Sequence, residues 1–494
     1  MTQLGAGALP LTVGILSHKR PHLLPRVLIA LAQQDLAAFE VVVAGDLPTL
    51  EAFDLPGDLA LGVRYLHVTE PNVSHARNCV IAAAGGDIVA FCDDDAVPEP
   101  DWLRRVAEPF ANPKVGAVGG LVRARDGLEV EWRGVTFDRS AREFALDAAQ
   151  GIQVMGSAEQ CATARFGGLM GANSAFRRAA VVAVGGFDEA YRYFLDETDM
   201  ALRLAEAGWD MAVTDRAEVH HLREVNAVRG HLKKPRNLRE VAASKAFFCE
   251  QHLDPAAIEP ELARFRARRD ADCDGFIRIG AMRGVERDRL LSQVDDGLAE
   301  GRLRTTRRYD GSWDRPTYAP WPGATRAAAD LNIALYCGWG FGRGRRLIRL
   351  AERLVAAGHR VSVFRFQTGF AAHAVEFRRG IWHHEGGTWR FDHREDGRPV
   401  ILRHHRVAAE IARVAQRRNF HLRLDPVLRG GQHVLRLPGV PSLSITPMRR
   451  DLDLAAVRDR LAVDSGAPPT PVSDGTHRGP VPSDLTRTVP SVLK

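Results

Sequence analysis

A short apolar run that ends in three carboxylates constrains the fold of this chain more than any other feature. Ile88 to Phe91 are apolar, and Asp93, Asp94 and Asp95 follow after a single residue. A run of this length and composition is typical of a strand buried on both faces of a sheet. Because open α/β sheets bind ligands beyond the carboxyl ends of their strands, we expect the three acids at a ligand-binding edge.

Adjacent carboxylates repel one another unless a cation joins them. Hard oxygen ligands suit Mg²⁺ or Mn²⁺, which proteins commonly hold through a few carboxylates and share with a substrate phosphate. The triplet Asp93–Asp95 therefore indicates a metal site. Taken alone, it is also compatible with an acidic turn that caps the following helix.

The flanking segments place this strand in an alternating α/β pattern. Expected strands and helices alternate over the first hundred residues, a pattern that predicts a mostly parallel sheet with helices on both faces. The expected strands are 11–16, 39–44, 63–67 and 88–91, and the expected helices are 21–34 and 73–84.

Composition narrows the class of protein. A chain of 494 residues has room for two or three domains. A net charge of +6 is too small to indicate a nucleic-acid binder, so we expect no nucleic-acid partner. Six cysteines without a CxxC pair suggest neither a disulfide framework nor a zinc site. Without a signal peptide or a long apolar run, we expect a cytoplasmic protein, with peripheral contact at the inner face of a membrane as an option.

Further blocks follow in a defined order. They are Ser74-His-Ala-Arg-Asn78, Gly171-Ala-Asn173, Gly185-Gly-Phe-Asp-Glu189 and Asp196-Glu-Thr-Asp-Met-Ala-Leu-Arg203. Together with Asp93–Asp95, their order and spacing resemble the family 2 glycosyltransferases, which are inverting, nucleotide-sugar-dependent enzymes of GT-A-type fold. The resemblance covers roughly residues 10–250.

The resemblance implies roles for the acidic blocks. Asp95 would bind the metal directly, Asp93 would bind it or contact ribose, and Asp94 would lie between them on the nucleotide side. His221 corresponds to a histidine that the family often uses as a metal ligand, although it is equally compatible with a surface or nucleotide-stacking role.

The same resemblance implies a general base near the start of a helix. The family's base is the second acid of a Glu-Asp pair, which corresponds to Glu197; here the order is reversed, so Asp196 remains an alternative. Asp199 and Arg203 are spaced as a helical i,i+4 ion pair.

Nucleotide and sugar contacts are expected from several further residues. Those on the nucleotide side are Ser17, Arg20, Asp46, Arg77 and Asn78, and those on the sugar side are Gly171, Asn173 and Trp102. Arg77 is equally compatible with a buried structural arginine, Gly171–Asn173 with a plain turn, and Trp102 with helix packing. The family's uracil-reading aspartate falls on Gly45 and Asp46 stands one residue later, so uridine is not implied.

The chain is expected to divide into four parts. Residues 1–252 would form the GT-A-type domain, and 253–330 a charged helical segment with an irregular linker at 302–322. Residues 331–464 would be a Rossmann-like accessory domain, which resembles the N-terminal half of GT-B-type glycosyltransferases. Residues 465–494, rich in Pro, Ser, Thr and Gly, are expected to be a disordered tail.

The expected function is metal-dependent, inverting transfer of a sugar from a nucleotide-diphosphate sugar to a hydroxyl of a saccharide or lipid-linked acceptor. One alternative is a catalytically inactive sugar-nucleotide-binding or scaffold protein, motivated by the reversed Asp196-Glu197 pair. A nucleotidyltransferase is a further alternative. It is disfavoured because residues 12–21 carry only Gly14 where that class has a glycine-rich loop.

Overall fold

The computed structural model divides the chain into two compact units. The first comprises Met1–Ala329 and Val375–Gly380, and the second comprises Asp330–Ala374 and Ile381–Lys494. The described residues are 9–36, 38–46, 59–127, 129–146, 151–224, 228, 230, 234–323, 331–337, 343–370, 373–393, 399–403, 413–414, 417–418, 422–426 and 442–445. The tail expected at 465–494 lies outside them.

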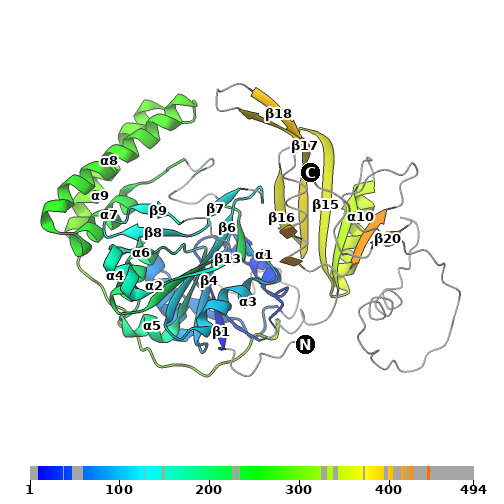
Figure 1. Ribbon diagram of the computed structural model, residues 1–494, viewed down its shortest axis with the longest axis horizontal. Coiled ribbons are helices and arrows are strands. Elements are labelled where there is room, and N and C mark those ends of the chain that lie inside the picture. Colours follow the sequence, from blue (N-terminus) through cyan, green and yellow to red (C-terminus); the bar gives the residue numbers. More distant parts are fainter. Residues whose placement is uncertain are drawn as a thin grey trace. The chain divides into compact units, whose positions relative to one another are not determined.

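A large mixed sheet forms the centre of the first unit (Figure 1). Its strand order is β10-β13-β6-β12-β4-β1-β2-β3, with β5 paired to β13 and β7 paired to β6. The strands are β1 (Leu11–Ser17), β2 (Glu40–Gly45), β3 (Arg64–His67), β4 (Ile88–Cys92), β5 (Ala96–Pro98), β6 (Val115–Arg123), β7 (Val130–Trp132), β10 (Ile152–Met155), β12 (Asn173–Arg177) and β13 (Asp210–His221). A separate small sheet contains β8 (Val135–Asp138), β9 (Glu143–Ala145) and β11 (Arg165–Gly167).

The expected α/β class, with a mostly parallel sheet flanked by helices, is confirmed. Strands β1 to β4 are joined by parallel pairings, β13 runs parallel to β6, and β12 runs antiparallel to both its neighbours. The helices of this unit are α1 (Leu24–Leu31), α2 (Val73–Ala83), α3 (Trp102–Ala107), α4 (Ser157–Thr163), α5 (Arg178–Ala183), α6 (Asp196–Glu206), α7 (Arg239–His252), α8 (Pro255–Arg278) and α9 (Gly284–Arg302).

Alternating side chains of β4 build a core on each face of the sheet. Ile88 and Ala90 pack with α1 and α3, whereas Val89 and Phe91 pack with α2, α5 and α6. Successive residues of a strand point to opposite faces, so a continuous apolar run requires cover on both. Gly14 of β1 lets α2 come close, because a Cβ at this position would lie 2.7 Å from the side chain of Val80 on that helix.

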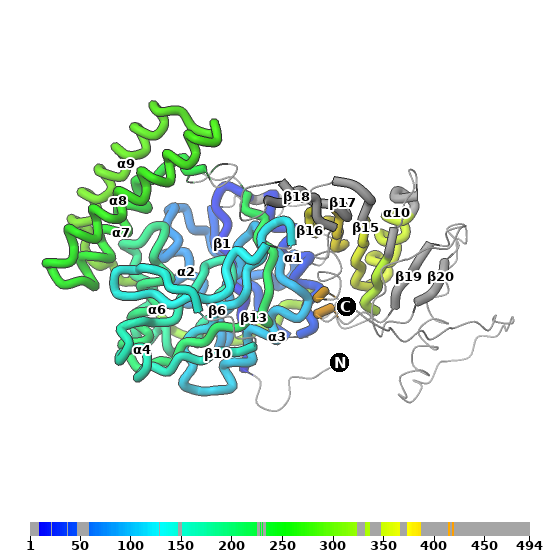
Figure 2. The backbone as a smooth tube through the Cα atoms, turned by 45° about the horizontal axis from the view of Figure 1, so that its top comes forward, coloured from blue at the N-terminus to red at the C-terminus, as the bar shows by residue number. Residues whose placement is uncertain are grey.

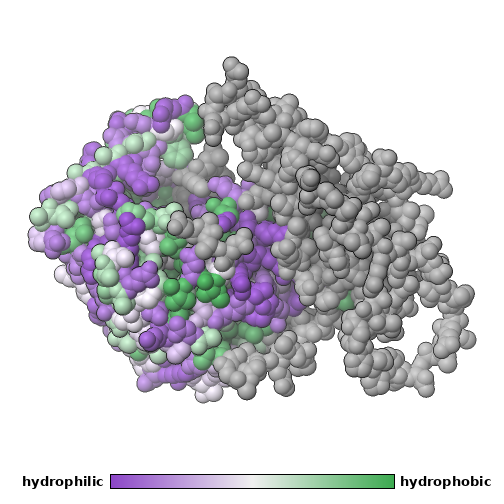
Figure 3. Space-filling view, in the orientation of Figure 1, coloured by the Kyte–Doolittle hydropathy of each residue, from purple (hydrophilic) through white to green (hydrophobic). Residues whose placement is uncertain are grey.

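The three C-terminal helices of the first unit pack on one another (Figure 2). Gly297 and Gly301 of α9 face the backbone of α7 so closely that a Cβ at either position would collide with a carbonyl oxygen, of Arg239 and Ala243 respectively. Glycine permits this approach because it carries no side chain. The visible face of α8 and α9 is mainly hydrophilic, in keeping with their charged sequence (Figure 3).

The segment 303–323 overlaps the linker that its irregular sequence predicted at 302–322. It runs along the first unit, with Arg307 paired to Glu70 at 3.0 Å and Arg315 paired to Asp87 at 2.7 Å. Trp321 is 0% exposed and belongs to the main core. Its arginines and aromatic residues have partners far away in the sequence, so we call residues 303–323 the strap. The first unit accordingly extends to Ala329.

The second unit contains a sheet whose strands lie in the order β17-β15-β14-β19-β20, with β18 paired to β17. Strand β14 (Asn332–Cys337), helix α10 (Arg343–Ala356) and strand β15 (Arg360–Phe370) form a strand–helix–strand unit with parallel pairing. The other strands of this unit are β17 (Ile381–His393), β18 (Pro399–Arg403), β19 (Leu422–Pro426) and β20 (Ser442–Ile445). Strand β16 (Ala374–Arg378) belongs to the first unit from Val375 onward. In neither unit does a described helix combine the length and the apolar character needed to span a bilayer.

Candidate active site

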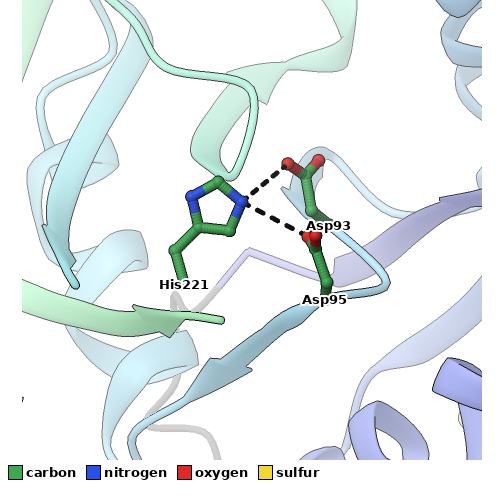
Figure 4. A group of neighbouring side chains, drawn as sticks. All are labelled: Asp93, Asp95 and His221. Carbon is green, nitrogen blue, oxygen red and sulfur yellow. Dashed lines mark ion pairs between the residues drawn. The ribbon is translucent and has the colours of Figure 1, made fainter. Parts of the chain in front are cut away.

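The acids that follow β4 meet a histidine at the end of β13. Strand β5 comes directly after Asp93–Asp95 and pairs antiparallel with β13, with Ala96 opposite His221. This register brings His221 Nε2 to 3.3 Å from Asp95 Oδ1 and 3.9 Å from Asp93 Oδ2 (Figure 4). Two carboxylates and one imidazole from distant segments thus converge on one point.

The donor set fits a divalent cation such as Mn²⁺ or Mg²⁺. Asp93 is 37% exposed at its side chain, whereas Asp95 and His221 are 5% and 4% exposed, so the group is buried but accessible from one side. Partial desolvation and the charge of Asp95 raise the pKa of Asp93. Asp95 itself is desolvated, but His221 and Arg20 outweigh this and hold its pKa below the usual range. A cation at this point would relieve the repulsion between the two carboxylates.

The turn after β1 closes the site from the side of Asp94. Ser17 Oγ donates a hydrogen bond to Asp94 at 2.7 Å, and Arg20 lies 2.6 Å from Asp94 and 3.1 Å from Asp95. Burial raises the pKa of Asp94 to about 7, against the opposing effects of Arg20 and Ser17. Asp46, just beyond β2, accepts a hydrogen bond from the Lys19 backbone at 2.8 Å. The structure therefore groups Ser17, Arg20 and Asp46 at the same edge of the sheet.

Arg77 contacts both candidate general bases, Asp196 and Glu197, at the start of α6. Its guanidinium lies 2.7 Å from Glu197 Oε1 and directly contacts Asp196, and its side chain is only 3% exposed. The rings of Phe91 and Phe187 flank it at 5.6 and 5.3 Å. Arg77 was expected on the nucleotide side, but both of its terminal nitrogens are used by Asp196 and Glu197.

The two acids differ in exposure and in the direction in which their pKa values are shifted. Asp196 is 3% exposed at its side chain, whereas Glu197 is 17% exposed. Burial raises the pKa of Asp196 well above its usual range. Burial also tends to raise the pKa of Glu197. The charge of Arg77 and a hydrogen bond from Asp196 outweigh this effect, so the pKa of Glu197 is lowered. The opposite directions of these pKa shifts favour the protonated form of Asp196 and the carboxylate form of Glu197.

Two local features of the backbone set the position of this pair. Phe194 and Leu195, directly before α6, have φ of 74° and 66°, the left-handed region that few residues other than glycine adopt. Such conformations are retained where the surrounding structure holds them, often at functional sites. Gly171 lies so close that a Cβ there would collide with the Glu197 carboxylate and the Arg77 guanidinium, which makes glycine the residue that fits.

Three residues expected to touch nucleotide or sugar instead lie in the interior. Asn78 is 0% exposed; its amide nitrogen donates to the Phe187 carbonyl, and its amide oxygen accepts from the Phe187 N–H. Trp102 is 0% exposed and donates its indole N–H to Asn173 Oδ1 at 2.8 Å. Asn173 is also 0% exposed, and its amide nitrogen donates to two carbonyl groups, of Leu121 and Ala217. We correct these expectations to structural roles, because every polar group named here is used inside the fold.

The remaining expectation at α6 concerned Asp199 and Arg203. Their side chains pair at 2.7 Å, and Asp199 also lies 2.9 Å from His252 of α7. This is the helical ion pair predicted from the spacing.

Several charged residues near the site were not anticipated. Glu131 of β7 lies 3.2 Å from His221 Nδ1, and Arg223 contacts the same carboxylate. His220 lies 2.9 Å from Glu99 and 3.6 Å from Glu218. The adjacent histidines 220 and 221 were the available signal, since neighbouring residues of a strand face opposite sides and need separate partners. Nothing in the sequence around Glu131 marks it.

Comparisons with known proteins identify a family for part of the chain. Residues 12–180 match the model of the family described as glycosyl transferase family 2. The succinoglycan biosynthesis protein ExoM of Rhizobium meliloti is 34% identical over 125 residues, which is 24% of this chain and 40% of that protein. The beta-monoglucosyldiacylglycerol synthase of a Synechocystis species is 33% identical over 140 residues, 28% of this chain and 27% of that protein.

Among solved structures, a mannosyltransferase from Pyrobaculum calidifontis in complex with GDP-Man and Mn²⁺ aligns at 18% identity. The alignment covers 60% of this chain and 87% of that one, with a TM-score of 0.35. The chain spans less than half the length of the two curated relatives just named.

Proposed function

Because residues 12–180 match the model of glycosyl transferase family 2, we propose that this chain moves a sugar from a nucleoside-diphosphate sugar to a hydroxyl group. The observation that carries the proposal is the pairing of two acidic centres. One is the candidate cation group of Asp93, Asp95 and His221, and the other is Glu197 held by Arg77. The two centres are close enough that Arg77 and Glu197 both influence the pKa of Asp93.

The first centre would serve the donor. A divalent ion bound by Asp93, Asp95 and His221 would stabilise the negative charge that develops on the departing diphosphate. Asp93, as the exposed member of the group, marks the side from which a diphosphate would approach. Arg20 is held against Asp94 and Asp95, so its main task in this account is to balance the charge of the acids.

The second centre would serve the acceptor. Glu197 would accept the proton of the attacking hydroxyl as general base. Its carboxylate is suited to this because Arg77 and Asp196 keep it ionised while part of it remains exposed. Attack from the side opposite the leaving diphosphate would invert the anomeric configuration. We therefore assign the base to Glu197 and a proton-holding, supporting role to Asp196.

The acceptor is proposed only as a class. One of the relatives is named for a polysaccharide and one for a glycolipid, which supports keeping a saccharide and a lipid-linked acceptor as the two options. A lipid-linked acceptor would bring the protein to a membrane surface.

A thermal-shift panel tests the donor and the metal together. Nucleoside diphosphates with each common base would be added to the full chain with and without Mn²⁺. A ligand that binds only the native state raises the melting temperature. At a hundred times its Kd, it increases the free energy of unfolding by about 2.7 kcal/mol. We expect one nucleotide to stabilise the protein strongly, and only with the metal present. Stabilisation by all nucleotides without metal, or no stabilisation by any nucleotide with the metal present, would contradict the proposal. Donor binding with no turnover would favour a non-catalytic binding protein.

A further inference from the structure

Two adjacent histidines of β13 are held by separate carboxylate networks. His221 faces Asp93 and Asp95, while His220 lies 2.9 Å from Glu99. Both histidines are almost completely buried. The two networks lie on opposite faces of the same strand end, as the alternation of side chains in a strand requires.

The network around His221 reaches a glutamate outside all the recognised sequence blocks. Strand β7 pairs antiparallel with β6 beside β13, and an irregularity in this pairing falls between Val122 and Arg123. Glu131 of β7 is 3% exposed at its side chain, and its Oε1 lies 3.2 Å from His221 Nδ1. The guanidinium of Arg223 contacts the same oxygen, so the carboxylate is held from two sides.

Hydrogen-bond chemistry gives this contact a direction. An ionised carboxylate can only accept, so the ring nitrogen facing Glu131 has to donate, which puts the proton of a neutral His221 on Nδ1. With a cation bound, Nε2 would then present its lone pair to the ion beside Asp93 and Asp95. Metal-bound histidines commonly depend on such a partner for their tautomer and ring orientation.

We propose that Glu131 is a positioning residue that holds His221 in the orientation and tautomer needed to bind a cation together with Asp93 and Asp95. This proposal rests on the cation site of the proposed function. Arg223 in turn fixes Glu131, so the chain of contacts runs from Arg223 through Glu131 to His221.

The network around His220 is a different kind of group. Glu99, Glu218 and His220 are close enough to hold a metal ion, and all three are 0–1% exposed. However, Arg123 Nε lies 2.7 Å from Glu218 Oε1, which places a fixed positive charge against these ligands. We therefore interpret this group as a buried ion network that supports the strand, and Glu218 supplies a matched control for Glu131.

The test measures binding of Mn²⁺ alone to the full chain, by calorimetry, in the absence of any nucleotide. In Glu131→Gln and Glu131→Ala, the Kd for Mn²⁺ should rise about 10–100-fold, the range found for residues that support metal ligands. Glu218→Gln removes a carboxylate from the other network and should leave the Kd within about threefold. Circular dichroism establishes that each variant is folded before it is titrated.

A second measurement needs no change at Glu131. In wild-type protein with ¹⁵N-labelled histidines and saturating Mg²⁺, a diamagnetic ion, the signal that disappears in His221→Gln should report a proton on Nδ1 and none on Nε2. A proton on Nε2 would overturn the proposal, as would Glu131 variants that bind Mn²⁺ like wild type. An equal loss of affinity in Glu218→Gln would overturn it too, because the effect would then be general to the strand. Wild type that binds no Mn²⁺ would overturn the cation site itself, and this assignment with it.

Discussion

Replacing Trp321 by alanine tests whether the strap is part of the folded core. Trp321 is 0% exposed and packs beside Phe39, with ring centroids 5.8 Å apart. Its indole N–H donates to the Leu59 carbonyl at 3.2 Å, and its backbone N–H donates to the Phe39 carbonyl at 2.7 Å. The substitution removes the ring and the indole hydrogen bond but leaves the backbone bond intact.

The expected cost follows from these contacts. Truncating a fully buried tryptophan to alanine costs about 3–5 kcal/mol, and the loss of one neutral hydrogen bond is included in that range. We therefore expect Trp321→Ala to lower the free energy of unfolding of the first unit by about 4 kcal/mol. For a unit of this size, that corresponds to a fall in melting temperature of roughly 6 °C.

Leu303→Ala is the matched control, since Leu303 lies at the start of the same segment and is 85% exposed. Its effect should stay within about 0.5 kcal/mol. Urea denaturation of the full chain, followed by circular dichroism, measures both variants against wild type. If Trp321→Ala cost less than about 1 kcal/mol, the strap would be a loosely attached linker and our account of its packing would be wrong.

Three further predictions concern the site and the units. Glu197→Gln should bind donor like wild type but turn it over about 10²–10⁴-fold more slowly; an unchanged kcat in this variant would remove Glu197 as the base. Arg77 lowers the pKa of Glu197, so the active carboxylate persists above that lowered value and is lost as the pH falls through it. In Arg77→Gln the acidic limb of the pH–kcat profile should therefore move to higher pH, and a limb at the wild-type position would refute this coupling. A protein ending at Ala329 should remain soluble and release nucleoside diphosphate, because both acidic centres precede that boundary; aggregation of this fragment would show that the two units depend on each other.

The parts of the fold that were predictable are those encoded by local patterns. The apolar run ending at Phe91 has no polar interruption, so it had to be a doubly covered strand, and its acids had to emerge at the strand end. The acids Asp196 and Glu197 likewise marked the start of a helix, and α6 begins at Asp196. Such features depend on neighbours in the sequence and can be read directly from it.

The parts that were not predictable depend on partners distant in the sequence. Arg77 is 119 residues from Asp196 in the sequence. It pairs with the two acids and not with a phosphate because of the way α2 and α6 are placed in the fold. Glu131 reaches His221 across 90 residues through an irregular strand pairing. Trp102 and Asn173 satisfy each other in the interior, which no local pattern distinguishes from a sugar contact. Burial and pairing, not residue type, decided these roles.

The most direct test of the account measures release of nucleoside diphosphate from a panel of nucleotide sugars, with Mn²⁺ or with a chelator, by wild type and by Asp95→Asn. Asp95 lies in the cation group, and its carboxylate contacts His221 and Arg20. We expect that one donor is turned over only when the metal is present. We also expect that Asp95→Asn loses this activity while keeping its fold. Release that continues at the same rate with the chelator, or in folded Asp95→Asn, would contradict the central claim.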